Sequence, residues 1–515
     1  MSVQAATLPV LRSAATAAEI RAFVLTHAWS LGLVGVLAAG GALRLVGLGS
    51  VGFNSDEAVY AGQAASVAGD PGYVPYFPIF RAHPMLFQTL LSLLYLDGVG
   101  DVEGRVLGAL FGVATIGVVY LTGSLLYGRP VGVLAAALMA VMPYHVVVTR
   151  QVLLDGPMTF FATVTLYLVA RYSVTQRPAW LYAAGGALGL TFLSKETGVL
   201  LLGSVYAFFA LSRHVHLRVR DLGLAFAAFL AVAIPYPMSL VFSGKGSTGS
   251  NFLAWQVFRR PNHGFAFYVT HVPTALGLVV VLLVLVGAVV LWHDRSWRET
   301  LLWSWIAVPV VVFELWSVKG FQYLLPIAPA VAILAAKCCL ALPRNAPVPE
   351  VYRRRVGAAL VVLTLASLAV PTWSRIHPGR DGTFLAGSGG VPGGRETGQW
   401  VAKNVPRGST LLALGPSMAN IVKFYGHRQT FGLSVSSNPL HRNPAYTPVG
   451  NPDLQIRTNK LQYLVWDSFS AGRSPYFAGQ LMRYVERYHG RAVHTETVQV
   501  GTVARPVVIV YEVRP

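Results

Sequence analysis

Long apolar runs recur along most of this chain, and they constrain its fold more than any other feature. A helix that crosses a bilayer needs about 20 mostly apolar residues. Eleven segments approach that length and are predicted as spans: 28–48, 105–126, 130–148, 156–172, 179–194, 197–212, 221–242, 273–292, 299–317, 321–342 and 356–373. The pattern predicts a polytopic α-helical membrane protein with about 11 transmembrane helices.

The composition agrees with a membrane protein and excludes an ordinary soluble one. Of the 515 residues, 54% are hydrophobic and 12% are charged, whereas soluble domains carry about 25% charged residues. The formal net charge of +19 does not indicate nucleic-acid binding, because most Lys and Arg lie in short loops between apolar runs. That placement is typical of loops on the cytoplasmic side of a membrane.

The basic loops also predict the topology. Arg171 and Arg177 precede the segments 179–194 and 197–212, and Arg218 follows them. Both flanks are therefore expected inside, with the charged pair Lys195-Glu196 at an outer turn, because charge is costly at mid-membrane. This gives eleven spans, a cytoplasmic N-terminus and an outer C-terminus, with the short apolar stretch 84–96 expected as an amphipathic helix on the outer face.

Beyond the last span the composition changes to that of a small α/β domain outside the cytoplasm. We expect a transmembrane domain over 1–373, a Gly- and Ser-rich linker over 374–394 and the α/β domain over 395–515. Its expected helices are 395–404, 417–425 and 475–488, and its expected strands are 410–414, 461–466 and 505–512.

Polar residues gather on the outer turns of this topology. They are Asp56, Glu57, Arg81, His83, Arg150, Asp155, Lys195, Glu196, Lys319, Gln322 and Tyr323. Any single charge at a helix end is commonly a solvated or snorkelling anchor, and Lys319 alone would be explained as a partner of Glu314. The joint pattern of acids and bases on successive outer turns favours a site.

Several of these residues stand in motifs that resemble the C-type membrane glycosyltransferases, which include protein O-mannosyltransferases and lipid A aminoarabinose transferases. The matching stretches, all within 28–343, are Gly52-Phe-Asn-Ser-Asp-Glu-Ala-Val-Tyr-Ala61, Ala82-His-Pro-Met-Leu86, Glu103-Gly-Arg105, Arg150-Gln-Val-Leu-Leu-Asp155, Leu193-Ser-Lys-Glu-Thr-Gly198 and Lys319-Gly-Phe-Gln-Tyr-Leu-Leu-Pro326. One motif departs from the family, since aminoarabinose transferases have Lys-Pro-Pro-Leu where this chain has His83-Pro-Met-Leu. The C-terminal domain resembles no family.

The resemblance implies roles at the matching positions. Asp56 resembles the catalytic acidic residue, Asp155 resembles the second acidic residue of the site, and Lys319 with Tyr323 resembles the element near the lipid phosphate. The implied donor is a polyprenyl-phosphate-linked sugar, and the implied acceptor is a hydroxyl on a protein, glycan or lipid at the outer face of the cell membrane.

The chemistry of such a transfer needs these residue types. The phosphate already leaves readily, so the enzyme needs a base for the acceptor hydroxyl, and direct displacement inverts the anomeric centre. Charge that builds on the phosphate needs fixed cations, for which Arg81, His83, Arg150 and Lys319 are available. A divalent cation (Mg²⁺ or Mn²⁺) held by Asp56 and Asp155 is an open possibility.

Two other functions remain open at this point. A transporter or flippase of a lipid-linked sugar would have broken helices and internal symmetry, and the sequence contains no internal repeat. A membrane-anchored binding module would not need so many spans. Neither the sugar nor the acceptor follows from the sequence.

Overall fold

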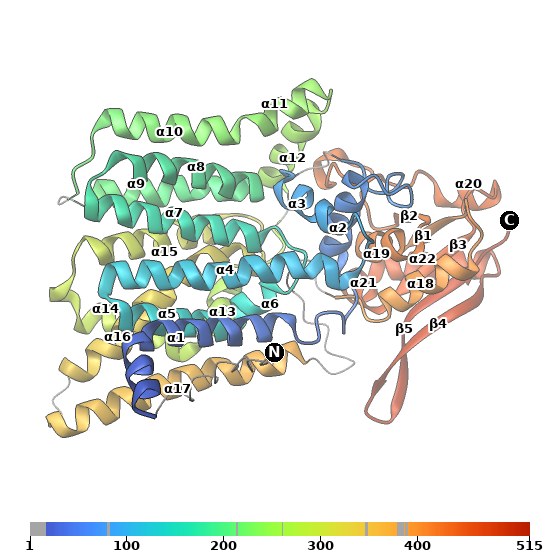
Figure 1. Ribbon diagram of the computed structural model, residues 1–515. Helices are drawn as coiled ribbons and strands as arrows, with labels where there is room; N and C mark the ends of the chain where they lie inside the picture. Colours follow the sequence, from blue (N-terminus) through green and yellow to red (C-terminus); the bar gives the residue numbers. More distant parts are fainter. Residues whose placement is uncertain are drawn as a thin grey trace, which may run out of the picture.

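The protein combines a long helical part with a C-terminal sheet (Figure 1). The computed structural model describes residues 17–79, 83–212, 215–259, 261–345, 349–377, 386 and 390–515. The helical part contains α1 (Ala17–Leu45), α2 (Ser55–Val67), α3 (Leu86–Leu94), α4 (Asp101–Tyr127), α5 (Arg129–Val141), α6 (Pro143–Thr149), α7 (Asp155–Thr175), α8 (Pro178–Ser194), η1 (Glu196–Leu200), α9 (Leu201–Leu211), α10 (Val219–Ala233), α11 (Pro235–Phe242), α12 (Gly246–Phe258), α13 (Ala266–Leu276), α14 (Leu278–Val290), η2 (Trp292–Asp294), α15 (Trp297–Leu315), η3 (Phe321–Ile327), α16 (Ala328–Asn345) and α17 (Glu350–Ile376).

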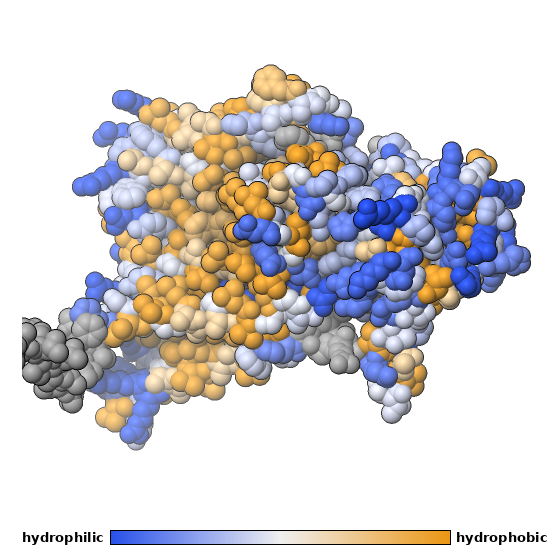
Figure 2. Space-filling model, turned by 45° about the vertical axis from the view of Figure 1, so that its right-hand side comes forward, coloured by the Kyte–Doolittle hydropathy of each residue, from blue (hydrophilic) through white to orange (hydrophobic). Residues whose placement is uncertain are grey.

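Several of these helices are long and apolar enough to cross a membrane, which makes the chain a membrane protein. Within the described residues, five segments qualify: His27–Leu45, Asp101–Tyr127, Val219–Phe242, Phe321–Asn345 and Glu350–Ile376. Two bent helix pairs, α5 with α6 and α13 with α14, qualify when each is taken as one span. The remaining predicted spans are helical in α7, α8, η1 with α9, and α15. A band of apolar side chains covers the helical part between hydrophilic ends (Figure 2).

Two of the predicted spans are not continuous helices. The segment 130–148 bends by 59° between α5 and α6, where Pro143 begins the second helix and has no backbone N–H to continue the first. The segment 273–292 bends by 100° at Gly277, whose φ of +95° suits glycine. A Cβ there would also collide with Leu368, so the close approach of α17 reinforces the break.

The segments that were expected on the outer face hold more helix than the sequence predicts. The stretch 84–96 contains α3 as expected, but α2, α12 and α13 begin in segments that were expected to be loops. The turn between α8 and η1 lies where it was predicted, with Lys195 in an extended conformation. The α2 and α3 helices lie at the end of the bundle that faces the sheet (Figure 1).

The C-terminal part is built on a five-stranded mixed sheet in the order β2-β1-β3-β5-β4. Strands β1, β2 and β3 are parallel, while β5 runs antiparallel to β3 and β4. Its elements are α18 (Gly394–Asn404), β1 (Thr410–Ala413), α19 (Pro416–Gly426), β2 (Gln429–Gly432), η4 (Pro439–His441), α20 (Pro452–Arg457), β3 (Tyr463–Asp467), α21 (Ser468–Arg473), α22 (Pro475–Arg487), β4 (Arg491–Val500) and β5 (Val503–Glu512). All six predicted elements are present, and β2, β4, α20 and α21 are additional.

The sheet part packs directly on α2 and α3 through α19. The ring of Phe424 lies 5.1 Å from that of Phe53 and 5.1 Å from that of Tyr73, centre to centre. These side chains are buried in one hydrophobic cluster with α2 and α3. The C-terminal part is therefore fixed against the helices. The domain boundaries stay a prediction, because most of the expected linker, 378–385 and 387–389, lies outside the described residues.

Candidate active site

The N-terminus of α2 is fixed by a capping box. The Asn54 side chain accepts hydrogen bonds from the backbone N–H groups of Asp56 (2.9 Å) and Glu57 (3.0 Å), and the Glu57 carboxylate accepts one from the N–H of Asn54 (3.1 Å). Such a cap satisfies the first N–H groups of a helix, which have no partner within it. The backbone around Asp56 is thereby held in one conformation.

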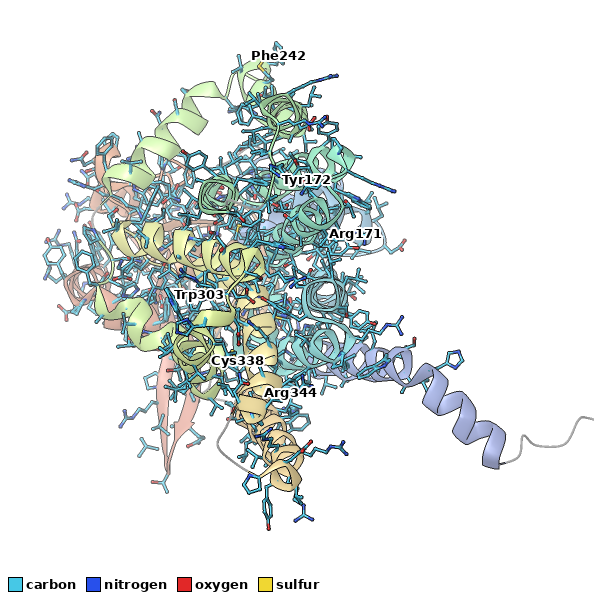
Figure 3. All side chains as sticks on the ribbon, turned by 90° about the vertical axis from the view of Figure 1, so that its left-hand side faces the viewer. Arg171, Tyr172, Phe242, Trp303, Cys338 and Arg344 are labelled. Atoms are coloured by element: carbon cyan, nitrogen blue, oxygen red, sulfur yellow. The ribbon has the colours of Figure 1, made fainter. Side chains whose placement is uncertain are left out.

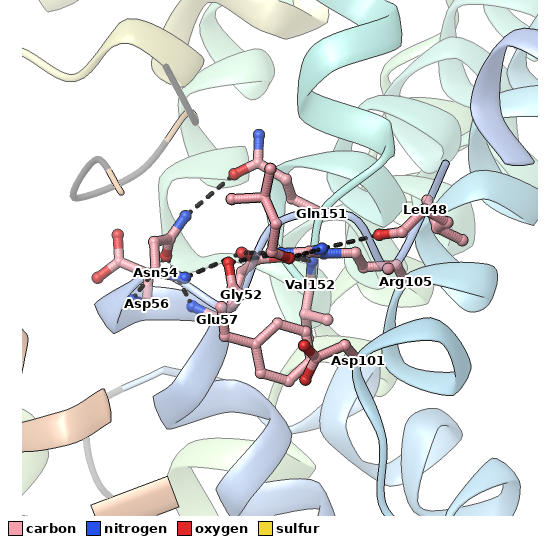
Figure 4. Close-up of polar contacts among 12 residues, drawn as sticks. Leu48, Gly52, Asn54, Asp56, Glu57, Asp101, Arg105, Gln151 and Val152 are labelled. Atoms are coloured by element: carbon pink, nitrogen blue, oxygen red, sulfur yellow. Dashed lines mark hydrogen bonds and ion pairs between the residues drawn. The ribbon is translucent and has the colours of Figure 1, made fainter. Parts of the chain in front are cut away.

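Glu57 is buried beneath this turn and is paired with Arg105. The guanidinium of Arg105 donates to both Glu57 oxygens at 2.8 Å and also to the carbonyls of the segment that leads into α2 (Figure 4). The Glu57 side chain is fully buried. In Figure 4 the neighbouring Asp56 carboxylate points away from this network. Glu57 thus supports the turn, and Asp56 is the carboxylate presented outward.

Asp56 lines a cavity of about 480 Å³ between the sheet-facing ends of the helices and the C-terminal part. The cavity brings together seven of the residues predicted from the sequence. These are Asp56, His83, Lys195, Glu196, Lys319, Gln322 and Tyr323.

Two acid–base pairs meet at this cavity. The Lys195 ammonium lies 2.8 and 3.0 Å from the two oxygens of Asp155 and 4.6 Å from the centre of the Tyr323 ring. Asp155 is almost fully buried, so it reaches the cavity through its lysine. The second pair joins His83 Nδ1 to a Glu196 oxygen at 2.8 Å.

Lys319 is buried at the edge of the cavity and interacts with Glu314. Its ammonium lies 3.7 Å from the Glu314 carboxylate and donates to the carbonyls of Phe313 and Glu314. The same ammonium sits over the rings of Phe265 and Tyr268, 5.2 and 5.3 Å from their centres. A role at the donor phosphate stays a prediction for this residue.

Arg150, a predicted site cation, does not line this cavity. Arg150 donates to the carbonyls of Leu43 (2.7 Å) and Val46 (2.8 Å), because these carbonyls at the C-terminal end of α1 need donors. It lines a separate small cavity beside Arg105. Arg81 lies outside the described residues.

The structure adds cations that were not predicted as site residues. Arg259 lies in the segment after α12, whereas Arg442 and Arg473 come from the C-terminal part, and all three line the cavity. Arg442 is held by the carbonyls of Ser436 and Ser437 at 3.2 and 3.0 Å. No motif in the sequence marks them, because a cavity wall formed by distant segments has no local pattern.

The wall is therefore electropositive. Permanent cations outnumber carboxylates five to two among its described lining residues: Lys195, Arg259, Lys319, Arg442 and Arg473 against Asp56 and Glu196. Burial lowers the pKa of Arg259, and the charges of Tyr323 and Asp56 oppose that effect. Such an arrangement favours an anionic ligand such as a phosphate.

The donor set fits a divalent cation poorly. The described residues contain no group of three or more His, Cys, Asp or Glu side chains suited to a metal. Both Asp155 oxygens are already bonded to Lys195, so the expected chelate of Asp56 and Asp155 would have to displace an ammonium. We derive no step through a metal.

A larger cavity, about 990 Å³, lies among α9, α14, α15 and α16 and contains none of the predicted site residues. Trp303 and Cys338, labelled in the view from the bundle end opposite the sheet (Figure 3), line it. Its charged lining residues are Arg295 and the ion pair of Glu299 with Lys337, 2.7 Å apart. Its walls are mostly apolar, so the smaller cavity has the chemistry expected of an active site.

Comparisons with known proteins give one family-model match and several solved structures of similar fold. Residues 82–238 match the family model described as dolichyl-phosphate-mannose-protein mannosyltransferase. The resemblance to the C-type membrane glycosyltransferases is confirmed. No curated protein sequence matches the chain.

The likeness in fold to solved structures extends over nearly the whole chain. ArnT from Cupriavidus metallidurans in the apo state aligns with a TM-score of 0.68 and 15% identity, over 95% of this chain and 98% of ArnT. ArnT bound to undecaprenyl phosphate gives 0.62 and 16%, over 94% and 98%. The oligosaccharyltransferase AglB from Archaeoglobus fulgidus gives 0.57 and 12%, over 94% of this chain and 74% of AglB.

Proposed function

We propose that this protein is an inverting glycosyltransferase that moves a sugar from a polyprenyl-phosphate donor to a hydroxyl acceptor at the outer face of the membrane. The observation that carries the proposal is the cavity in which the Asp56 carboxylate faces a wall rich in cations. The fold shared with ArnT, which has been solved with undecaprenyl phosphate, supports a lipid-phosphate donor.

Asp56 acts as the base in this proposal. Its carboxylate accepts the proton of the acceptor hydroxyl while the hydroxyl oxygen bonds to the anomeric carbon. The bond from that carbon to the phosphate oxygen breaks, and polyprenyl phosphate leaves with the electron pair. Attack opposite to the leaving group inverts the anomeric centre, and no carboxylate nucleophile is needed.

The cations stabilise the leaving phosphate. Lys195 and Arg259 are held in place before the donor arrives, the first by Asp155 and the second over the Trp255 ring at 4.5 Å. Charges that are fixed in advance need no reorganisation when negative charge develops. Five cations in one wall can perform this function without a divalent ion, so we expect EDTA to leave transfer intact.

The distribution of charge supports an active site outside the cytoplasm. The loops and helix ends farthest from the sheet carry Arg129, Arg177, Arg218, Arg295 and the run Arg353-Arg354-Arg355, as expected of the cytoplasmic side. The cavity lies at the other end of the bundle (Figure 1). We propose eleven spans on this basis, two of which are the bent pairs.

Transfer by the purified, reconstituted protein tests the function. Polyprenyl phosphates that carry radiolabelled mannose, arabinose or glucose are supplied in turn, and release of polyprenyl phosphate is measured with transfer of the label. Asp56→Asn keeps the size of the side chain but loses the base, so transfer should fall by about 100-fold or more while donor binding survives.

The matched control is Asp97→Asn, an exposed aspartate on the same outer segment, which should retain wild-type transfer. Wild-type activity in Asp56→Asn contradicts the assignment of the base. Movement of intact donor across the membrane without release of polyprenyl phosphate contradicts the transferase and indicates a flippase.

A further inference from the structure

The sheet presents its ligand-binding edge to the reaction cavity. In open α/β sheets, ligands bind at the carboxyl ends of the parallel strands. The segments that follow β1, β2 and β3 supply Pro416, Ser434 and Arg473 to the cavity wall. The C-terminal part is thus placed to contact a substrate.

A second cavity of about 780 Å³ lies beside the reaction cavity and shares part of its wall, including Trp255, Ser436 and His441. It is lined by α12, by the segment that follows β2 and by α22. Because the two cavities share this wall, we treat them as one groove, with Asp56 in the reaction cavity and Phe477 and Gln480 in the second.

The side chains of this second cavity suit a saccharide. Trp255 and Phe477 offer aromatic rings, while Ser436, His441 and Gln480 offer hydrogen-bonding groups. Sugar rings stack their C–H faces on aromatic rings and bond through hydroxyl groups. The described lining residues include no carboxylate and one permanent cation, Arg259, so nothing there selects a cationic peptide.

The place of the groove argues against a lipid acceptor. Its walls beyond Trp255 come mainly from the C-terminal part, where hydrophilic side chains dominate the surface (Figure 2). A lipid would instead enter through the apolar band of the helices.

We propose that this groove binds a neutral glycan acceptor, whose terminal hydroxyl then reaches Asp56. The inference rests on the proposed function, because it assigns the acceptor class of that same reaction. It also explains the presence of the C-terminal part, since the carboxyl edge of the sheet and α22 hold the acceptor while the helices hold the donor.

The experiment uses the full-length protein with its donor and three acceptor probes: short manno- and arabino-oligosaccharides, a Ser/Thr-containing peptide, and vesicles that contain lipid A. Transfer to an oligosaccharide is expected. Phe477→Ala and Gln480→Ala should raise the KM for the oligosaccharide by about 10-fold, a loss typical of one stacking or hydrogen-bonding contact. Their effect on donor hydrolysis in the absence of acceptor should be much smaller.

Tyr476→Ala is the matched control, since this exposed neighbour on α22 does not line the groove. It should keep the wild-type KM. The proposal is overturned if the label goes only to the peptide or to lipid A, or if no oligosaccharide receives it. It is also overturned if the KM for the oligosaccharide is unchanged in both Phe477→Ala and Gln480→Ala. Donor hydrolysis without acceptor depends on the reaction cavity alone. A wild-type protein that does not cleave the donor would therefore count against the proposed function instead.

Discussion

Two adjacent acids at the start of α2 have opposite surroundings, and the difference assigns their functions. Successive residues on a helix point in different directions. Glu57 points into the protein, where Arg105 and the N–H of Val152 satisfy its oxygens, while Asp56 points into the cavity. Removal of the Glu57 carboxylate would leave a buried guanidinium without its partner, a change that costs about 3–5 kcal/mol. Its variants therefore report on stability.

Variants of Lys319 test whether this cavity cation binds the donor phosphate or only neutralises Glu314. A charge-assisted contact contributes about 1.5–3 kcal/mol, roughly 10- to 150-fold in binding. Lys319→Ala should raise the KM for the donor by at least about 10-fold. It should also lower thermal stability, because the Glu314 carboxylate loses its cation. In Lys319→Ala/Glu314→Gln we expect stability to recover and the raised KM to remain.

Both quantities are measured on the same detergent-purified samples, by thermal unfolding and by donor titration. The single variant Glu314→Gln is the control and should keep the wild-type KM. Recovery of donor use in the double variant contradicts the phosphate role and makes Lys319 a structural partner of Glu314.

At the scale of elements, α19 links the sheet to the helix that carries Asp56. The Tyr425 hydroxyl donates to Asp101 (2.7 Å) and accepts from the N–H of Phe53 (2.8 Å), three residues before Asp56. The Asn420 side chain donates to Ser55 Oγ at 3.0 Å. Tyr425 is thus a positioning residue for the turn that carries the base.

Tyr425→Phe should reduce turnover as well as stability. The change leaves the buried N–H of Phe53 without an acceptor, at a cost of about 1–3 kcal/mol, and loosens the turn before Asp56. We expect kcat to fall several-fold with little change in donor KM, because no donor contact is removed. Tyr488→Phe is the control, because it removes a similar hydrogen bond, to Asp453 at 2.6 Å, within the C-terminal part. Equal losses of kcat in the two variants would exclude a positioning role for Tyr425.

The elements also show how far the sequence could predict this fold. The length of the apolar runs located the long helices, and alternating helix and strand signals located six C-terminal elements. The sequence pattern missed β4, whose Arg491–Val500 residues are largely exposed at a sheet edge, and β2, a short strand that ends in Gly432, a residue type depleted in strands. It also missed the bend at Gly277, because that break depends on Leu368 of a distant helix.

The candidate site was predictable to the extent that its residues lie in local motifs. The first-loop motif placed Asp56 at the cavity, and the Asn54-Ser-Asp-Glu57 spacing already contains the capping box that separates the two acids. Arg442 and Arg473 could not be predicted, because they reach the cavity only when the sheet docks through α19. Arg150 was misplaced because its distance from the end of α1 is not visible in the sequence.

At the scale of the whole molecule, charged, apolar and cavity-bearing regions follow one another along one axis, the long direction of the helix bundle. Basic loops lie at one end of the helices, the apolar band lies between, and the cavity and sheet lie at the other end (Figures 1 and 2). A donor whose lipid lies in the membrane and an acceptor in the groove would then meet at Asp56 from opposite sides. The arrangement explains why the C-terminal part is packed against the outer helices and not tethered loosely.

The axis predicts which residues are accessible from each side of the membrane. In a background in which Cys338 and Cys339, both buried, are replaced by serine, single cysteines are introduced at the exposed positions Asp97, Arg218 and Gly472. A membrane-impermeant maleimide should label positions 97 and 472 in intact cells but position 218 only after permeabilisation, because the Arg-rich loops are held inside. Positions 97 and 218 are joined by α4–α9, an odd number of crossings in the eleven-span arrangement. Labelling of both from the same side would contradict that arrangement and, with it, an active site at the outer face.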